Sequence, residues 1–165
     1  MNTVTVGLLR DDEIEPLQKL AEAIWRVTYK DLISHEQLVY MLDHRHRPAL
    51  LRQLLARGDR IFAARGGGQL VGFAHAYVTG EGNCKLDKIY VSTDLQRHGI
   101  GSLLMREVEH YARQKGCEQL VLRVNKRNIR AIAAYQKYGF GLASALTEDI
   151  GNGFVMDDYV MAKSL

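Results

Sequence analysis

The fold of this protein is decided by one stretch of sequence, Gln96-Arg97-His98-Gly99-Ile100-Gly101-Ser102. It joins an apolar segment typical of a strand (86–91) to a segment with the apolar spacing of a helix. Glycines 99 and 101 have no Cβ, so the backbone N–H groups here can come close to a ligand. The first turn of a helix also has unpaired N–H groups and the positive end of the helix dipole. The stretch therefore predicts a phosphate-binding loop, with a plain strand–helix turn as the alternative.

This loop differs from the two common nucleotide-binding loops. Leu104 stands where a dinucleotide-binding loop would have its third glycine. The Gly-Lys-Ser/Thr sequence of a P-loop is also missing after Gly101. Neither nucleotide-binding interpretation therefore fits.

The segments on both sides of the loop predict alternating strands and helices. Strands are expected at 3–9, 61–64, 70–79, 84–92, 118–124, from 140 onward, and at 154–162. Helices are expected at 11–29, from the Ser34/Gln37 capping box, from Pro48 to Gly58, after Gly99 as far as Gly116, and at 128–137. This order predicts one mixed α+β domain over 1–165, with a strand–helix–strand crossover in its middle.

Composition and charge narrow the class of protein. The chain has 165 residues, of which 47% are hydrophobic and 25% charged, as in a globular domain. Residues 83–142 hold eleven Lys or Arg against five Asp or Glu, which suits a small polyanion better than nucleic acid. The segment 1–13 does not have the pattern of a signal peptide, and no apolar run is long enough for a membrane span. Cys84 and Cys117 are expected to be reduced thiols in a cytoplasmic protein.

Two motifs resemble one known family. Gln96-x-x-Gly99-x-Gly101 matches the loop of the GNAT superfamily of acetyl-coenzyme A-dependent N-acetyltransferases. The second motif matches the asparagine–tyrosine helix of that family and its Gly-Phe step, Asn128-x-x-Ala131-x-x-x-Tyr135-x-x-x-Gly139-Phe140. Shorter strings, at 88–91 and 161–165, are similar to the PaiA-type polyamine acetyltransferase branch. The resemblance implies a single domain whose central sheet, of about seven mostly antiparallel strands, is splayed and flanked by helices.

The resemblance also implies where acetyl-coenzyme A binds. The pantetheine arm would run along the strand that contains Ile89, Tyr90 and Val91. The pyrophosphate would lie on the N–H groups of residues 97–102, with Gln96 at the start of the loop. Lys137 and other cations of this region, Arg97, Lys126, Arg127 and Arg130, could meet the remaining phosphate charge, or could simply be exposed. Asn128 would contact the cofactor, and it also suits the N-cap of its helix.

Tyr135 is the residue that the resemblance places at the chemical step. A tyrosine with an ordinary pKa near 10 is protonated at neutral pH and can protonate the departing thiolate. Without the surrounding motif, a tyrosine that packs a helix onto the sheet would be the simpler interpretation.

The general base is harder to place from the sequence. Many family members have a glutamate near the start of the fourth strand, where this chain has Asn83, Cys84 and Lys85. Asp87 is the nearest carboxylate and is the candidate base, with His75 on the preceding strand as a weaker alternative. Asp87 could equally be a surface partner of Lys85 and Lys88.

The expected activity is acetyl transfer from acetyl-coenzyme A to a primary amine in a ternary complex. A polyamine is the first expectation, because carboxylates lie in the segment where the family builds its acceptor site, namely Asp31, Glu36 and Asp43. A peptide N-terminus or another small amine is the alternative substrate, and a non-catalytic coenzyme A sensor is the alternative of another class.

The remaining expectations concern partners and charged residues elsewhere. The partner is a small-molecule amine, a homodimer stays open, and no nucleic acid, membrane or metal is expected. His44 and His46, flanked by arginines, are interpreted as a polar connection between helices. Asp157 and Asp158 on the last strand could face a cationic substrate or could be exposed edge charges.

Overall fold

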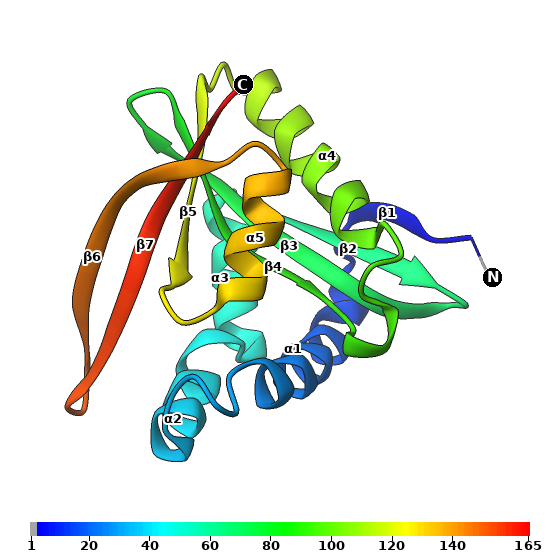
Figure 1. Cartoon of the computed structure of the whole chain (residues 1–165). Helices are drawn as coiled ribbons and strands as arrows, with labels where there is room; N and C mark the ends of the chain where they lie inside the picture. The colour runs from blue at the N-terminus through cyan, green and yellow to red at the C-terminus, as the bar shows by residue number, and fades with distance from the viewer. Residues whose placement is uncertain (1–2) are drawn as a thin grey trace.

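The computed structural model describes residues 3–165, which form one mixed α+β domain (Figure 1). Its strands are β1 Thr5–Leu8, β2 Arg60–Gly66, β3 Gln69–Gly80, β4 Asn83–Val91, β5 Gln119–Asn125, β6 Gly141–Gly151 and β7 Phe154–Ser164. Its helices are α1 Ile14–Thr28, α2 His35–Arg45, α3 Pro48–Arg57, α4 Ile100–Gln114 and α5 Ile129–Lys137, with short 3₁₀ turns at Asp11–Glu13 and Thr93–Leu95. The predicted order of elements is confirmed, and Met1 and Asn2 of the segment compared with a signal peptide lie outside the described residues.

The seven strands form one sheet in the order β1-β2-β3-β4-β5-β7-β6. All neighbouring strands are antiparallel except β4 and β5, which are parallel. β4 and β5 pair only from Asn83–Lys85 to Gln119–Val121, and they then diverge. Beyond Lys85, the edge of β4 that faces β5 therefore has no ladder partner within residues 3–165. This split is the splayed sheet that the resemblance implies.

Helices cover both faces of the sheet (Figure 1). Side chains of opposite parity on a strand point to opposite faces, so neighbouring residues enter different cores. Phe62 and Ala74 pack with α4, whereas Ile61 and Phe73 pack with α1 and α3. A third cluster joins α1 and α2 to the β6–β7 hairpin through Trp25, Leu38 and Met41, with Ile150 and Met156 at its margin. This third cluster holds the β6–β7 hairpin against α1 and α2.

Local signals in the sequence explain where several elements begin and end. Ser34 caps α2 by accepting a hydrogen bond from the N–H of Gln37, as predicted. The reciprocal half of the capping box is wrong, because the buried Gln37 amide donates instead to the carbonyl of Val155 on β7 (2.9 Å). Pro48 begins α3, and Gly58 ends it with a φ of 102°, which favours glycine.

Two further expectations concern the whole chain. Cys84 and Cys117 are buried free thiols. Within residues 3–165, none of the helices is long and apolar enough to cross a bilayer.

Candidate active site

The split between β4 and β5 opens into a cavity of about 1580 Å³. One side of it consists of β4, the loop that follows β4, and α5. The other side consists of side chains from α1, α2, β5 and the β6–β7 hairpin. The loop and the helix that the sequence motifs indicate therefore reach one cavity, although they lie about 30 residues apart in the chain.

The glycine loop supplies the backbone N–H groups that the sequence predicts. Arg97 and Gly99 have φ values of 66° and 81°, so the loop turns through the left-handed region twice before α4 begins. Leu103 N–H bonds to the Gly99 carbonyl at 3.1 Å, which leaves the N–H groups of residues 100–102 without an intrahelical partner. Gly101 is packed closely, because a Cβ there would lie 2.8 Å from Tyr138 Oη. The loop can therefore hold an anion.

Most of the predicted cofactor residues line this cavity. They are Ile89, Tyr90, Val91, Gln96, Arg97, Gly99, Ile100, Gly101, Ser102, Asn128, Tyr135 and Lys137. Asn128 also caps α5, because its Oδ1 accepts the N–H of Ala131 at 3.2 Å. His98 differs: it is exposed, its Nδ1 lies 2.9 Å from the Gln96 carbonyl, and it is not among the residues that line the cavity within 3–165.

The other basic residues expected near the phosphates differ in whether they reach the cavity. Arg130 lines the cavity. Lys126 pairs with Asp157 at 2.7 Å. Arg127 donates to the carbonyls of Asp31 and Leu32, which ties the turn between β5 and α5 to the segment between α1 and α2. Arg127 and Lys126 are thus occupied by protein partners.

Tyr135 extends from α5 into the cavity. Its ring packs edge-on against Phe140, with a centroid separation of 5.9 Å. Burial raises the pKa of the Tyr135 phenol above its ordinary value, with smaller contributions from Tyr29 and Tyr138. The hydroxyl is therefore protonated throughout the neutral range, as a proton or hydrogen-bond donor requires.

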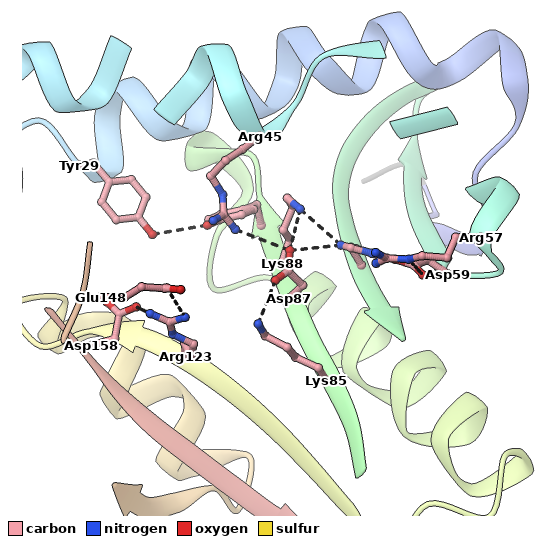
Figure 2. Close-up of polar contacts among 12 residues, drawn as sticks. Tyr29, Arg45, Arg57, Asp59, Lys85, Asp87, Lys88, Arg123, Glu148 and Asp158 are labelled. Carbon is pink, nitrogen blue, oxygen red and sulfur yellow. Dashed lines mark hydrogen bonds and ion pairs between the residues drawn. The ribbon is translucent and has the colours of Figure 1, made fainter. Parts of the chain in front are cut away.

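Asp87 on β4 lies among basic side chains (Figure 2). Its Oδ2 is 2.7 Å from Lys88 Nζ, 3.3 Å from His75 Nδ1 and 3.6 Å from Arg45 Nη2, and its Oδ1 is 3.6 Å from Lys85 Nζ. Burial raises the pKa of Asp87, but the hydrogen bond to His75 and the charges of Lys88 and Arg45 outweigh it and lower that pKa well below its ordinary value. Asp87 is thus an ionised carboxylate with basic neighbours on several sides.

His75 connects Asp87 to a second carboxylate. His75 Nε2 lies 2.5 Å from Asp59 Oδ2, and both side chains are buried. Arg57 holds Asp59 through two hydrogen bonds of 2.7 and 2.9 Å. A chain of polar groups therefore runs from Asp87 through His75 and Asp59 to the exposed Arg57. Figure 2 shows Asp87, Asp59 and Arg57 along this path.

A second charged cluster lies where β5, β6 and β7 meet, and of its members the sequence had indicated only Asp158 (Figure 2). Arg123 Nη1 bonds to Glu148 Oε2 at 2.7 Å, and its Nη2 lies 3.2 Å from Asp158 Oδ2. All three residues line the cavity. Asp157 is exposed, whereas Asp158 is only 2% exposed. Neighbouring residues on a strand point to opposite faces of the sheet, and this alternation is the sequence signal that could have distinguished the two aspartates.

The carboxylates expected to build the acceptor site lie elsewhere. Asp31, Glu36 and Asp43 are exposed and are absent from the cavity lining within the described chain. Asp43 instead pairs with Arg47 at 3.7 Å, and Asp31 borders a separate pocket of about 390 Å³. The expectation that they face this cavity is wrong, because the segment around them packs its apolar residues into the core cluster with Trp25 and leaves its carboxylates exposed.

Comparisons with known proteins agree with this geometry. The model of the "Acetyltransferase (GNAT) family" matches residues 17–140. The structure of PaiA N-acetyltransferase from Thermoplasma acidophilum in complex with coenzyme A aligns with a TM-score of 0.85 and 21% identity over 99% of both chains.

Two curated relatives are similar over shorter stretches. Streptothricin acetyltransferase of Streptomyces lavendulae is 39% identical over 93 residues, which cover 53% of this chain and 49% of the relative. Spermine/spermidine N(1)-acetyltransferase of Bacillus subtilis is 31% identical over 81 residues, which cover 44% of this chain and 53% of that protein. These alignments span about half of each relative.

Proposed function

The chain belongs to the acetyltransferase (GNAT) family, and we propose that it transfers the acetyl group of acetyl-coenzyme A directly to a primary amine, with Tyr135 as general acid. It is an acetyltransferase, and acetyl-coenzyme A is its acetyl donor. The observation that carries the proposal is the position of Tyr135, which lines the same cavity as the unpaired edge of β4 and the N-terminus of α4.

The cofactor would lie along residues with free backbone groups. The pyrophosphate would accept hydrogen bonds from the N–H groups of residues 100–102, at the positive end of α4. The pantetheine amides would pair with the edge of β4 at Ile89–Val91, which β5 leaves free within the described residues. Gln96, Arg97, Asn128 and Lys137 would complete the site, since each lines the cavity. His98, which bonds within its own loop, would act through the shape of that loop.

Acetyl transfer then requires two proton movements. The amine nitrogen attacks the thioester carbon, and the C–S bond breaks with its electron pair on sulfur. The Tyr135 hydroxyl gives its proton to this thiolate, and the nitrogen loses a proton, which returns through water to the Tyr135 phenolate and leaves an amide. Because the pKa of Tyr135 is raised, the proton moves only as charge develops on the sulfur, and the resulting phenolate is quickly reprotonated.

The amine must lose its first proton before it attacks. At pH 7.4 this costs about 4 kcal/mol for an amine with a pKa near 10.4. Asp87 is the carboxylate that would receive the proton, directly or through water, and its lowered pKa makes it a weak base that would hold the proton only briefly. Lys88, Lys85 and Arg45 also favour the neutral form of a nearby amine, because like charges lower the pKa of an ammonium group.

The substrate class that fits best is a small polyamine. The similarity to the spermine/spermidine acetyltransferase covers less than half of this chain and supports the class without identifying the compound. Two carboxylates that line the cavity, Glu148 and Asp158, share a single arginine and suit a cationic acceptor.

The test is release of free thiol from acetyl-coenzyme A across a panel of polyamines, lysine, aminoglycosides and a peptide N-terminus. We expect the highest kcat/KM with polyamines, and we expect activity to rise with pH as the neutral amine fraction grows. Equal turnover of unrelated amines would contradict the polyamine assignment. Tight binding of acetyl-coenzyme A without turnover of any amine would favour a coenzyme A sensor instead.

A further inference from the structure

Asp158 is a buried carboxylate at the edge of the cavity, and one of its oxygens is unpaired. The residue is 2% exposed. Its Oδ2 lies 3.2 Å from Arg123 Nη2, whereas its Oδ1 is buried and has no hydrogen-bond partner within residues 3–165. A buried carboxylate oxygen without a donor is costly, so folded proteins seldom keep one without a reason. Burial raises the pKa of the Asp158 carboxyl above its ordinary value, and Arg123 offsets this only in part.

The charges around Asp158 do not balance. Arg123 is shared between Asp158 and Glu148, so one guanidinium faces two carboxylates. With both carboxylates ionised, these three residues carry one net negative charge, and Arg45 is a further cation whose charge acts on Asp158. A ligand that supplies one positive charge and one N–H donor would satisfy both the charge and the free oxygen.

The cluster is set apart from Asp87. Asp87 lies on β4 and has three basic partners besides His75, so it offers little to an additional cation. Asp158 lies on β7, opposite Asn125 of β5 and Leu146 of β6, across the split from β4 (Figure 2). A ligand that reaches from one cluster to the other would have its reacting nitrogen on the side of β4 and a second group beside Asp158.

We propose that Asp158 binds a second, non-reacting ammonium group of the acceptor and thereby makes the enzyme prefer diamines and polyamines over monoamines. This inference rests on the proposed amine acetyltransferase function. The ammonium donates a hydrogen bond to Asp158 Oδ1, while Arg123 holds Oδ2 and Glu148 holds Arg123 in place. The reacting amine remains free to lose its proton toward Asp87, because the positive charge that anchors the acceptor is at its other end.

The experiment compares 1,5-diaminopentane with pentylamine, which has the same chain and lacks the second ammonium. In the wild-type enzyme we expect kcat/KM for the diamine to be at least about tenfold higher, the range of a charge-assisted hydrogen bond. Asp158→Asn keeps the shape of the side chain and removes its charge. It should raise KM for the diamine at least about tenfold while leaving KM for pentylamine and the Kd of acetyl-coenzyme A within about twofold.

Asp157→Asn is the matched control. Asp157 is the neighbouring residue on β7, but it is exposed, pairs with Lys126 at 2.7 Å and accepts from Thr147. We expect this variant to behave as wild type with both amines.

The outcomes separate this inference from the proposed function. If wild type turns over both amines equally well, or if Asp158→Asn raises KM for both equally, Asp158 is not a second ammonium site although the acetyltransferase function stands. If wild type turns over neither amine, the proposed function fails first and this inference fails with it. If Asp158→Asn does not fold, equal kcat/KM of the wild type for the two amines still overturns the inference.

Discussion

The two sides of the cavity use different chemistry. One side, the cofactor wall, consists of β4, the 96–102 loop and α5. Besides side chains such as Asp87 and Tyr135, it offers backbone groups to the cofactor, namely the free edge of β4 and the N–H groups that begin α4. The other side, the acceptor wall, is built from side chains of α1, α2, β5, β6 and β7 and includes the Arg123, Glu148 and Asp158 cluster. Backbone groups suit a cofactor that is the same for every acceptor, because substitutions leave the backbone groups in place. Charged side chains can be replaced one at a time by mutation, so an enzyme can evolve to accept another amine without losing its cofactor site.

The largest expected effect is on the cofactor wall. Gly99→Val places a β-branched residue at a φ of 81°, where no described atom lies within 4 Å of the added Cβ. The chain should fold with a loss of roughly 2 kcal/mol in unfolding free energy, because the strain is local. The loop would no longer aim its N–H groups at the pyrophosphate, and we expect acetyl-coenzyme A affinity to fall about 100-fold, equivalent to roughly two charge-assisted hydrogen bonds.

Gly68→Val is the control for this substitution. Gly68 has a φ of 79°, lies in the β2–β3 turn and also has no described atom within 4 Å of an added Cβ. It should show the same loss of stability by urea unfolding, with unchanged affinity by calorimetry. Unchanged affinity in Gly99→Val would contradict the phosphate-loop assignment.

The next effect concerns the hydroxyl that the cofactor wall contributes to catalysis. Tyr135→Phe keeps the ring that packs against Phe140 and removes one hydroxyl. A positioned general acid contributes about 10²–10⁴ in rate, and a thiolate is already a fair leaving group, so we expect kcat to fall about 100-fold. The Kd of acetyl-coenzyme A should change less than about threefold. Pre-steady-state thiol release would show whether chemistry limits the rate.

Tyr138→Phe is the matched variant on the same end of the helix. Tyr138 also lines the cavity, and its Oη accepts a hydrogen bond of 3.4 Å from Ser102. We expect kcat close to wild type. If Tyr138→Phe loses activity and Tyr135→Phe keeps it, the acid is Tyr138.

The difference between the walls also explains what the sequence could predict. The 96–102 loop and α5 were recognised because each is a contiguous motif whose glycines and asparagine have one local structural task. The family resemblance that these two motifs carry also implied the splayed sheet with its split between β4 and β5. The Arg123, Glu148 and Asp158 cluster comes from three strands that become neighbours only through the β5-β7-β6 pairing. Its three residues share no sequence pattern. The sequence named Asp157 and Asp158 together as residues that could face a cationic substrate, and only Asp158 lines the cavity within the described residues.

His46 shows the same limit on a single residue. Flanked by arginines, it was expected to belong to a polar connection, which is wrong: it is 1% exposed, and its ring lies edge-on to Trp25 at 5.3 Å. The turn between α2 and α3 directs this side chain inward beneath the acceptor wall, while Arg47 remains exposed. The sequence contains no signal for this, because the orientation is decided by packing against Trp25 and Phe73.

Buried His46 predicts that acid destabilises the fold beneath the acceptor wall. Burial, with the charges of Lys88 and Arg45, lowers the pKa of His46 to about 3. In the unfolded chain its pKa is near 6.5, so between these values the unfolded state binds more protons and stability falls as pH falls. The contribution of His46 between pH 7 and pH 5 is a loss of about 2 kcal/mol.

Urea unfolding at pH 7 and pH 5 measures this loss. His46→Phe should remove about 2 kcal/mol of the pH dependence, since phenylalanine does not titrate and suits an aromatic environment. His44→Gln, at an exposed position two residues earlier, should leave the pH dependence unchanged. An unaltered slope in His46→Phe would mean that His46 can take up a proton in the folded state.

The smallest expected effect lies within the acceptor wall and tests whether burial, rather than charge alone, determines which carboxylate matters. Glu148 and Asp158 share Arg123, but the Glu148 side chain is 51% exposed and that of Asp158 only 4%. Exposed ion pairs contribute about 0–1 kcal/mol because water and salt screen them. Glu148→Gln should therefore raise KM for 1,5-diaminopentane less than about threefold, since Arg123 would still be held by Asp158. Steady-state kinetics at low and high salt would measure this, and the small effect of Glu148→Gln should shrink further as salt rises, whereas that of Asp158→Asn should persist. A larger effect for Glu148→Gln than for Asp158→Asn would place the ammonium site at Glu148, the exposed end of the cluster. The acceptor would then be bound by a charge that solvent screens, and not by the buried Asp158 carboxylate.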